Sequence, residues 1–116
     1  MPGLRKLSWL HYDARKFTHY LLSPDHPTGR YKARVFASLG FDRSNWPLLK
    51  DELTRLTLVR GALPQRETPG GWAIFVRGRI QGVGRRSGEF VIVWLLESPT
   101  YRRARFVTAY PGGDPR

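Results

Sequence analysis

Residues 90–96 read Phe-Val-Ile-Val-Trp-Leu-Leu, the longest apolar run of the chain. No polar side chain interrupts it, so both faces of the segment are apolar, as in the central strand of a sheet. The run is far shorter than the roughly 20 residues that a membrane-crossing helix needs. We therefore expect a buried strand over residues 89–97, with further strands beside it.

Polarity alternates in the segments 72–80 and 102–110, as it does in half-buried strands. In the last segment the alternation predicts one face with Phe106, Thr108 and Tyr110, and an opposite face with Arg103 and Arg105. Short connections between consecutive strands favour an antiparallel meander. Residues 61–71, rich in glycine and proline, are expected to form a loop before it.

The first half of the chain has helical periodicity instead. We expect helices over residues 13–21, 30–39 and 44–58, with breakers at Pro24 and Gly40 between them. The predicted class is therefore α+β, with three N-terminal helices packed on one face of a C-terminal antiparallel β-meander. The length predicts a single domain over residues 1–116, with its helical part at about 13–58 and its sheet part at about 72–110.

Charge points to a polyanionic partner. The chain has 20 basic and 9 acidic residues, a net charge of +11, and sixteen of the basic residues are arginines. Arginine binds phosphate through a planar fork of donors and stacks on bases, which favours RNA as the partner. A genome-wide preference for arginine over lysine is the alternative explanation.

Several classes of site are excluded by residues that the chain lacks. It has no cysteine, so disulfides, thiolate nucleophiles and cysteine-bound zinc are excluded. The three histidines have no ligand spacing, and no nucleotide-binding loop is present, so we expect no metal and no cofactor. The first ten residues lack an apolar core and a cleavage site, which predicts no signal peptide and a cytoplasmic protein.

Lys32 and His26 are the two strongest candidates for chemistry. At 100° per residue, Lys32 falls between Leu39 and Phe36, inside an apolar arc of the second predicted helix that also includes Tyr31 and Val35. A lysine there either extends to solvent, pairs with a buried carboxylate, or acts on a substrate. His26 lies in a turn between two prolines, which would orient its imidazole for acid–base work unless it is simply solvated.

Arginines beside an aromatic residue form a candidate RNA-binding face on the first predicted strand. These residues are Phe75, Arg77 and Arg79. Single-stranded RNA binds such faces through stacking and charge, although a solvated strand face explains them equally well. Further candidate nucleic-acid contacts lie on the second helix and in the loop between the first two strands, at Arg30, Arg34, Arg85 and Arg86.

Residues 20–36, Tyr-Leu-Leu-Ser-Pro-Asp-His-Pro-Thr-Gly-Arg-Tyr-Lys-Ala-Arg-Val-Phe, are followed by Leu-Gly-Phe at 39–41 and Phe-Val-Thr-Ala-Tyr-Pro at 106–111. Together these segments resemble an uncharacterised bacterial family of small stand-alone proteins and polymorphic-toxin C-termini. The order of helices and sheet is also similar to the barnase–EndoU–colicin–RelE ribonuclease superfamily. On the family motif, the matching positions are His26, Gly29, Lys32, Thr108 and Tyr110.

Two hypotheses follow from this resemblance and from the residues. The first is a toxin-type, metal-independent endoribonuclease, in which His26 or Lys32 acts as base or phosphate clamp, Arg105 neutralises the phosphate, and Thr108 or Tyr110 assists. The second is a non-catalytic module that binds RNA or a small acidic, antitoxin-like protein. The sequence leaves the oligomeric state open.

Overall fold

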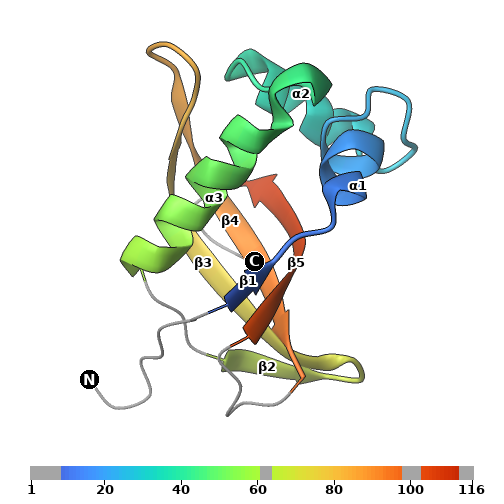
Figure 1. Cartoon of the computed structure of the whole chain (residues 1–116), viewed down its shortest axis with the longest axis vertical. Coiled ribbons are helices and arrows are strands. Elements are labelled where there is room, and N and C mark those ends of the chain that lie inside the picture. Colours follow the sequence, from blue (N-terminus) through green and yellow to red (C-terminus); the bar gives the residue numbers. More distant parts are fainter. Residues whose placement is uncertain (1–8, 61–63, 98–102, 113–116) are drawn as a thin grey trace.

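Five strands form one mixed sheet, with strand order β1-β5-β4-β3-β2 (Figure 1). The computed structural model describes residues 9–60, 64–97 and 103–112. Its elements in chain order are β1 (Trp9–His11), α1 (Ala14–Lys16), the π-helical turn η1 (Phe17–Leu21), α2 (Arg30–Ser38), the 3-10 turn η2 (Arg43–Asn45), α3 (Trp46–Arg60), β2 (Pro64–Thr68), β3 (Gly71–Gln81), β4 (Ser87–Leu96) and β5 (Arg103–Pro111). The α+β class is confirmed.

The prediction of N-terminal helices followed by a purely antiparallel sheet is wrong in two respects. Strand β1 precedes the helices and pairs parallel with β5, where Leu10 lies opposite Ala104. Strand β2 lies inside the predicted loop and pairs antiparallel with β3. The polarity pattern of the sequence reveals neither strand. Strand β1 has only three residues, and β2 begins at a proline, a residue tolerated at the start of a strand. Residues 61–63 of that loop and Arg102 of the third predicted strand lie outside the described residues.

The predicted antiparallel pairing of β3, β4 and β5 is confirmed. The register of β3 on β4 runs without interruption from Trp72↔Leu96 to Gln81↔Ser87. Strand β4 lies in the middle of the sheet, as expected from its apolar sequence. Its even-numbered residues are buried in the core, namely Phe90, Ile92, Trp94 and Leu96.

A β-bulge in β5 changes which residues share a face. Thr108 pairs with Val93, whereas Phe106 pairs with Trp94, so Val107 is an extra residue in the strand. Phe106 before the bulge and Ala109 after it are both buried in the core. The predicted grouping of Thr108 with Phe106 is therefore wrong. A bulge inserts one residue and reverses the alternation, so Thr108 and Tyr110 share the face of Arg105.

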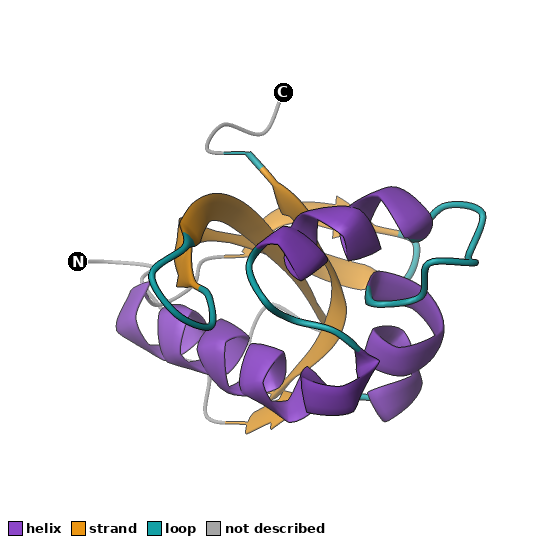
Figure 2. Ribbon diagram, turned by 90° about the horizontal axis from the view of Figure 1, so that it is seen from above, coloured by secondary structure: helices purple, strands orange, loops and turns teal. Residues whose placement is uncertain are grey.

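The helices pack on one face of the sheet and around the end of β5 (Figure 1). Helix α3 runs along that face, and α2 lies across the end of the sheet near the end of β5 (Figures 1 and 2). The predicted apolar stripe of α3 is buried, and Leu56 packs so closely on β3 that a Cβ at Gly78 would lie 2.6 Å from its Cδ1 atom. No helix in the described part of the chain is long and apolar enough to cross a membrane.

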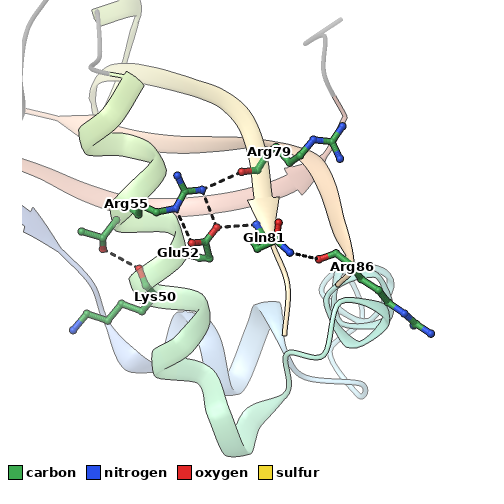
Figure 3. A network of polar contacts seen from close by, with 7 residues as sticks. Lys50, Glu52, Arg55, Arg79, Gln81 and Arg86 are labelled. Atoms are coloured by element: carbon green, nitrogen blue, oxygen red, sulfur yellow. Dashed lines mark hydrogen bonds and ion pairs between the residues drawn. The ribbon is translucent and has the colours of Figure 1, made fainter. Parts of the chain in front are cut away.

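Side chains from α3 also bind the free edge of β3. Strand β2 pairs with residues 71–74 only, so the rest of β3 is an edge. Three side chains bind its outward backbone groups (Figure 3 shows the last two): Arg60 Nε donates to the Arg77 carbonyl at 2.9 Å, Arg55 donates to the Arg79 carbonyl at 3.3 Å, and Glu52 accepts the Gln81 N–H at 2.7 Å. Helix α3 thus secures β3 through polar contacts as well as through its apolar stripe.

Candidate functional site

Three elements distant in sequence bring a lysine and two hydroxyl groups together. Lys32 Nζ on α2 donates to the Tyr20 hydroxyl on η1 at 2.5 Å and to Thr108 Oγ1 on β5 at 3.1 Å. The two hydroxyl oxygens lie 3.3 Å apart. We call Tyr20, Lys32 and Thr108, with His26 beside them, the Lys32 cluster.

The backbone around Tyr20 brings its side chain close to Lys32. The chain leaves α1 through a π-helical turn. Such turns are rare in proteins overall, and many of those that occur lie at functional sites. The start of α2 then approaches this turn so closely that a Cβ at Gly29 would lie 2.2 Å from the Tyr20 carbonyl oxygen. A residue without a side chain is therefore required at position 29, and it sets the distance between Tyr20 and Lys32.

In the described part of the chain, hydroxyl groups rather than a carboxylate bind the ammonium group of Lys32. Its side chain is half-buried, and Nζ also lies 4.9 Å from the centre of the Tyr20 ring. Among the residues that the structure describes, no acidic group pairs with Lys32, so the predicted alternative of a buried ion pair is not observed. The predicted apolar arc is wrong in one member, because Tyr31 is 61% exposed.

These contacts change the acidity of Tyr20. Burial by itself raises the pKa of the phenol, but the hydrogen bonds from Lys32 and Thr108, and the Lys32 charge, outweigh it. The net effect lowers the pKa of Tyr20 below its ordinary value of 10.0. A cation that stabilises the phenolate increases the fraction of Tyr20 that is ionised, and so able to accept a proton, at a given pH.

His26 is held in one orientation and one tautomer. Its Nδ1 atom accepts the backbone N–H of Gly29 at 3.0 Å and that of Thr28 at 3.1 Å. The ring also meets the Tyr20 ring edge to face, with centres 5.0 Å apart. Because Nδ1 accepts two N–H groups, the proton of the neutral imidazole lies on Nε2. His26 therefore presents a hydrogen-bond donor rather than an acceptor to a ligand.

A cleft of about 410 Å³ lies beside the cluster. Its lining residues are Asp13, Arg15, Lys16, His19, Tyr20 and His26. The one carboxylate among them is bound by Arg15, whose NH2 atom lies 2.9 Å from Asp13 Oδ2. Besides this ion pair, the lining includes Lys16 and two histidines, so the cleft is suited to bind an anion.

Comparison with known proteins assigns the chain to a family. Residues 4–113 match the family described as DUF6883, a domain of unknown function. The chain belongs to the DUF6883 family. The match includes every member of the Lys32 cluster and confirms the resemblance to an uncharacterised family. No curated protein and no solved structure matches the chain, and the likeness of this DUF6883 domain to the ribonuclease superfamily stays a prediction.

The other catalytic candidates of the DUF6883 domain lie near the cluster without contacting it. Arg105 is exposed on β5, opposite Leu95, and Tyr110 lies opposite Val91. The bulge places both on the same face of the sheet as Thr108. His26, Lys32 and Thr108 are thus brought together, whereas Arg105 and Tyr110 are not part of the hydrogen-bonded group.

The arginines of α2 belong to a different place in the DUF6883 domain. Arg30 and Arg34 line a cavity of about 670 Å³ whose apolar wall includes Leu22, Ala33 and Phe41. This cavity is separate from the cleft that contains His26. Both arginines are exposed.

The candidate RNA-binding arginines of the sheet and its loop differ in their surroundings. Arg79 is paired with Glu89 at 3.2 Å, and Arg86 donates to the Ser38 carbonyl at 2.9 Å. Arg85 is exposed in the turn between β3 and β4, and Arg77 is exposed on β3 beside half-buried Phe75. Of these residues, Phe75, Arg77 and Arg79 share a face with Thr108.

Tyr20 is the member of the cluster that sequence reasoning missed. The sequence places it in the first predicted helix, over residues 13–21, and assigns it no functional role. The structure has a π-helical turn there, in which residues are not spaced at 100°, so helical periodicity does not predict the direction of this side chain. The motif that begins at Tyr20 and includes His26 is the only signal in the sequence that singles this tyrosine out.

Proposed function

We propose that this DUF6883 domain is a metal-independent endoribonuclease and that the Lys32 cluster is its active site. The observation that carries the proposal is the pair of hydrogen bonds from one lysine to a tyrosine and a threonine, beside a cationic cleft. An RNA strand contains its own nucleophile, the 2′-hydroxyl, so cleavage needs only proton transfer and stabilisation of charge.

Tyr20 and Lys32 form an acid–base couple suited to this reaction. The Tyr20 phenolate takes the proton of the 2′-hydroxyl, the O2′–P bond forms, and the P–O5′ bond breaks. Lys32 gives a proton to the departing 5′-oxygen, and the products are a 2′,3′-cyclic phosphate and a 5′-hydroxyl. The hydrogen bond between the two groups then returns the proton from Tyr20 to Lys32, which restores both.

The remaining members of the cluster position the reacting groups. Thr108 Oγ1 accepts a hydrogen bond from Lys32 and thereby fixes the amine relative to Tyr20. His26, through its Nε2–H, provides a donor for a non-bridging phosphate oxygen, where negative charge develops. Lys16 in the cleft wall adds a positive charge for the adjacent phosphate.

The test is cleavage of total RNA by the purified chain in the presence of EDTA. We expect fragments that end in 2′,3′-cyclic phosphates, and no cleavage of a strand with 2′-O-methyl groups. Tyr20→Phe and Lys32→Met are expected to slow cleavage about 10²- to 10⁴-fold, the usual contribution of a general acid or base. Lys50→Met is the matched control, because Lys50 Nζ lies over the Tyr12 ring, 5.7 Å from its centre, and has no hydrogen bond to the Lys32 cluster among the described residues.

Three results would contradict the proposal. They are absence of cleavage by the folded chain on every RNA tried, cleavage that requires a divalent metal, and full activity of Lys32→Met. RNA binding without cleavage would instead support the second hypothesis, a non-catalytic module in which Lys32 merely connects η1, α2 and β5.

A further inference from the structure

The bulge at Val107 aligns residues from three strands into rows on the sheet face turned away from α3. One row consists of Tyr110, Val91 and Arg77, which are paired across β5, β4 and β3. The next row consists of Thr108, Val93 and Phe75. A third begins at Arg105 and continues through Leu95 and Ala73 to Arg66 of β2. Ala73 and Val91 are buried within these rows, and the other members connect β2 with Thr108 of the Lys32 cluster.

The rows combine flat apolar groups with guanidinium groups. Phe75, Val93 and Tyr110 are half-buried, so part of each side chain contacts solvent. The Arg66 guanidinium lies 5.3 Å from the centre of the Phe75 ring. An aromatic ring with an arginine on it is the kind of surface on which an unpaired base stacks.

Charge on this face is strongly one-sided. Arg66, Arg77 and Arg105 are exposed there. Among the paired residues of β3, β4 and β5, the face carries one carboxylate, that of Glu89, and Arg79 neutralises it at 3.2 Å. A phosphate backbone complements this distribution, and its binding releases condensed counterions.

We infer that the outer face binds single-stranded RNA and guides the strand to Thr108, with bases stacked on Phe75 and Tyr110 and phosphates on Arg66, Arg77 and Arg105. The inference rests on the proposed function, because the strand is guided to the Lys32 cluster only if that cluster acts on RNA. A duplex is disfavoured, because its bases are stacked on one another and cannot lie on side chains.

Binding is measured by fluorescence anisotropy with a labelled 2′-O-methyl single strand of about ten nucleotides, a length within the usual site sizes. This probe cannot be cut through its own 2′-oxygen, so binding is separated from cleavage. Phe75→Leu and Tyr110→Leu each remove a ring and retain an apolar side chain. Each is expected to raise Kd by about 5- to 150-fold, the loss of one base stack, with an unchanged salt dependence.

Arg66→Gln and Arg77→Gln are expected to weaken binding and to lower the slope of log Kd against log salt by about 0.7 each, as for one phosphate contact of a single strand. Arg43→Gln is the matched charge control, since Arg43 contacts Ser23 and Asp25, lines the separate cavity of Arg30 and Arg34, and should leave that slope unchanged. Two leucine variants and two glutamine variants keep the test valid if one of them fails to fold.

The outcomes distinguish this inference from the proposed function. Unchanged Kd values for the folded Phe75 and Tyr110 variants would overturn it, even if the protein cuts RNA. Equal affinity for duplex and single strand would overturn it too. So would RNA binding that is weakened by the glutamine variants and not by the leucine variants, because a surface that binds through charge alone is expected for an acidic protein partner. If the variants lose affinity and the wild-type chain never cuts RNA, the result would support RNA binding by the outer face and contradict the proposed nuclease activity.

Discussion

Lys32 Nζ and Thr108 Oγ1 lie 3.1 Å apart, although 76 residues separate them in the sequence. The contact forms because the bulge at Val107 turns Thr108 out of the core, where it meets Lys32 from the first turn of α2. Without the extra residue, Thr108 would share the buried face of Phe106. The position of the proposed active site thus depends on a single residue inserted into β5, and the predictions below test the groups around it.

The first prediction concerns the titration of Tyr20. Because the hydrogen bonds from Lys32 and Thr108 outweigh burial, Tyr20 should form its phenolate below its ordinary pKa of 10.0. The difference in ultraviolet absorbance between the wild-type chain and Tyr20→Phe isolates this group during an alkaline titration. Lys32→Met should move the transition to higher pH, since it removes the cation that favours the phenolate. A transition that stays in place would show that Lys32 does not stabilise the anion.

The second prediction concerns Gly29. An alanine there would place its Cβ 2.2 Å from the Tyr20 carbonyl oxygen, so the backbone must move. We expect a loss of roughly 1–3 kcal/mol in the free energy of unfolding, as for other overpacked sites, together with loss of activity in the folded fraction. Gly70→Ala is the control, because its nearest contact would be an ordinary 3.7 Å. Equal stability of the two variants would disprove the close approach.

The third prediction concerns a buried hydrogen bond between α3 and β4. Trp94 Nε1 donates to Thr57 Oγ1 at 3.1 Å, and Thr57 is 1% exposed. Thr57→Val keeps the shape and leaves the indole N–H without a partner, which costs about 1–3 kcal/mol. Chemical denaturation followed by circular dichroism measures the loss. Thr57→Ser keeps the hydroxyl and should cost less; the opposite order would refute the role assigned to this bond.

The fourth prediction concerns alkaline stability. Burial raises the pKa of Tyr12 to about 12, above its ordinary 10.0. The unfolded chain therefore loses this proton first as pH rises, so the free energy of unfolding decreases between pH 10 and about 12. The decrease is on the order of 2 kcal/mol. Tyr12→Phe should remove this part of the pH dependence, which denaturation at pH 8 and pH 11 would reveal.

The sequence predicts much of the helical half and the inner strands because their physical signals are local. Apolar residues on both faces of 90–96 indicate a central strand, and the stripe of Leu49, Leu53 and Leu56 indicates one buried face of a helix. Strand β1 gives no such signal, since it has three residues and its partner β5 lies at the other end of the chain. Its existence is a property of tertiary pairing.

The candidate site divides in the same way. His26 and Lys32 stand out locally, the first by its prolines and the second by its charge among apolar neighbours. Tyr20 does not, because its place in the cluster depends on the π-helical turn and on contacts with Lys32 and Thr108. The faces of Thr108 and Tyr110 are also hidden, because one bulged residue reverses the alternation and leaves no mark in the composition.

The side chains that α3 places on the edge of β3 also bear on self-association. An uncovered strand edge is a template on which another chain can add a strand, the first step of fibril growth. Here Arg60, Arg55 and Glu52 occupy that edge, and all three come from one helix (Figure 3 shows Arg55 and Glu52). The protection is therefore lost as a unit when α3 detaches. Aggregation of the concentrated protein should follow the opening of that single helix, at temperatures where β3, β4 and β5 are still paired.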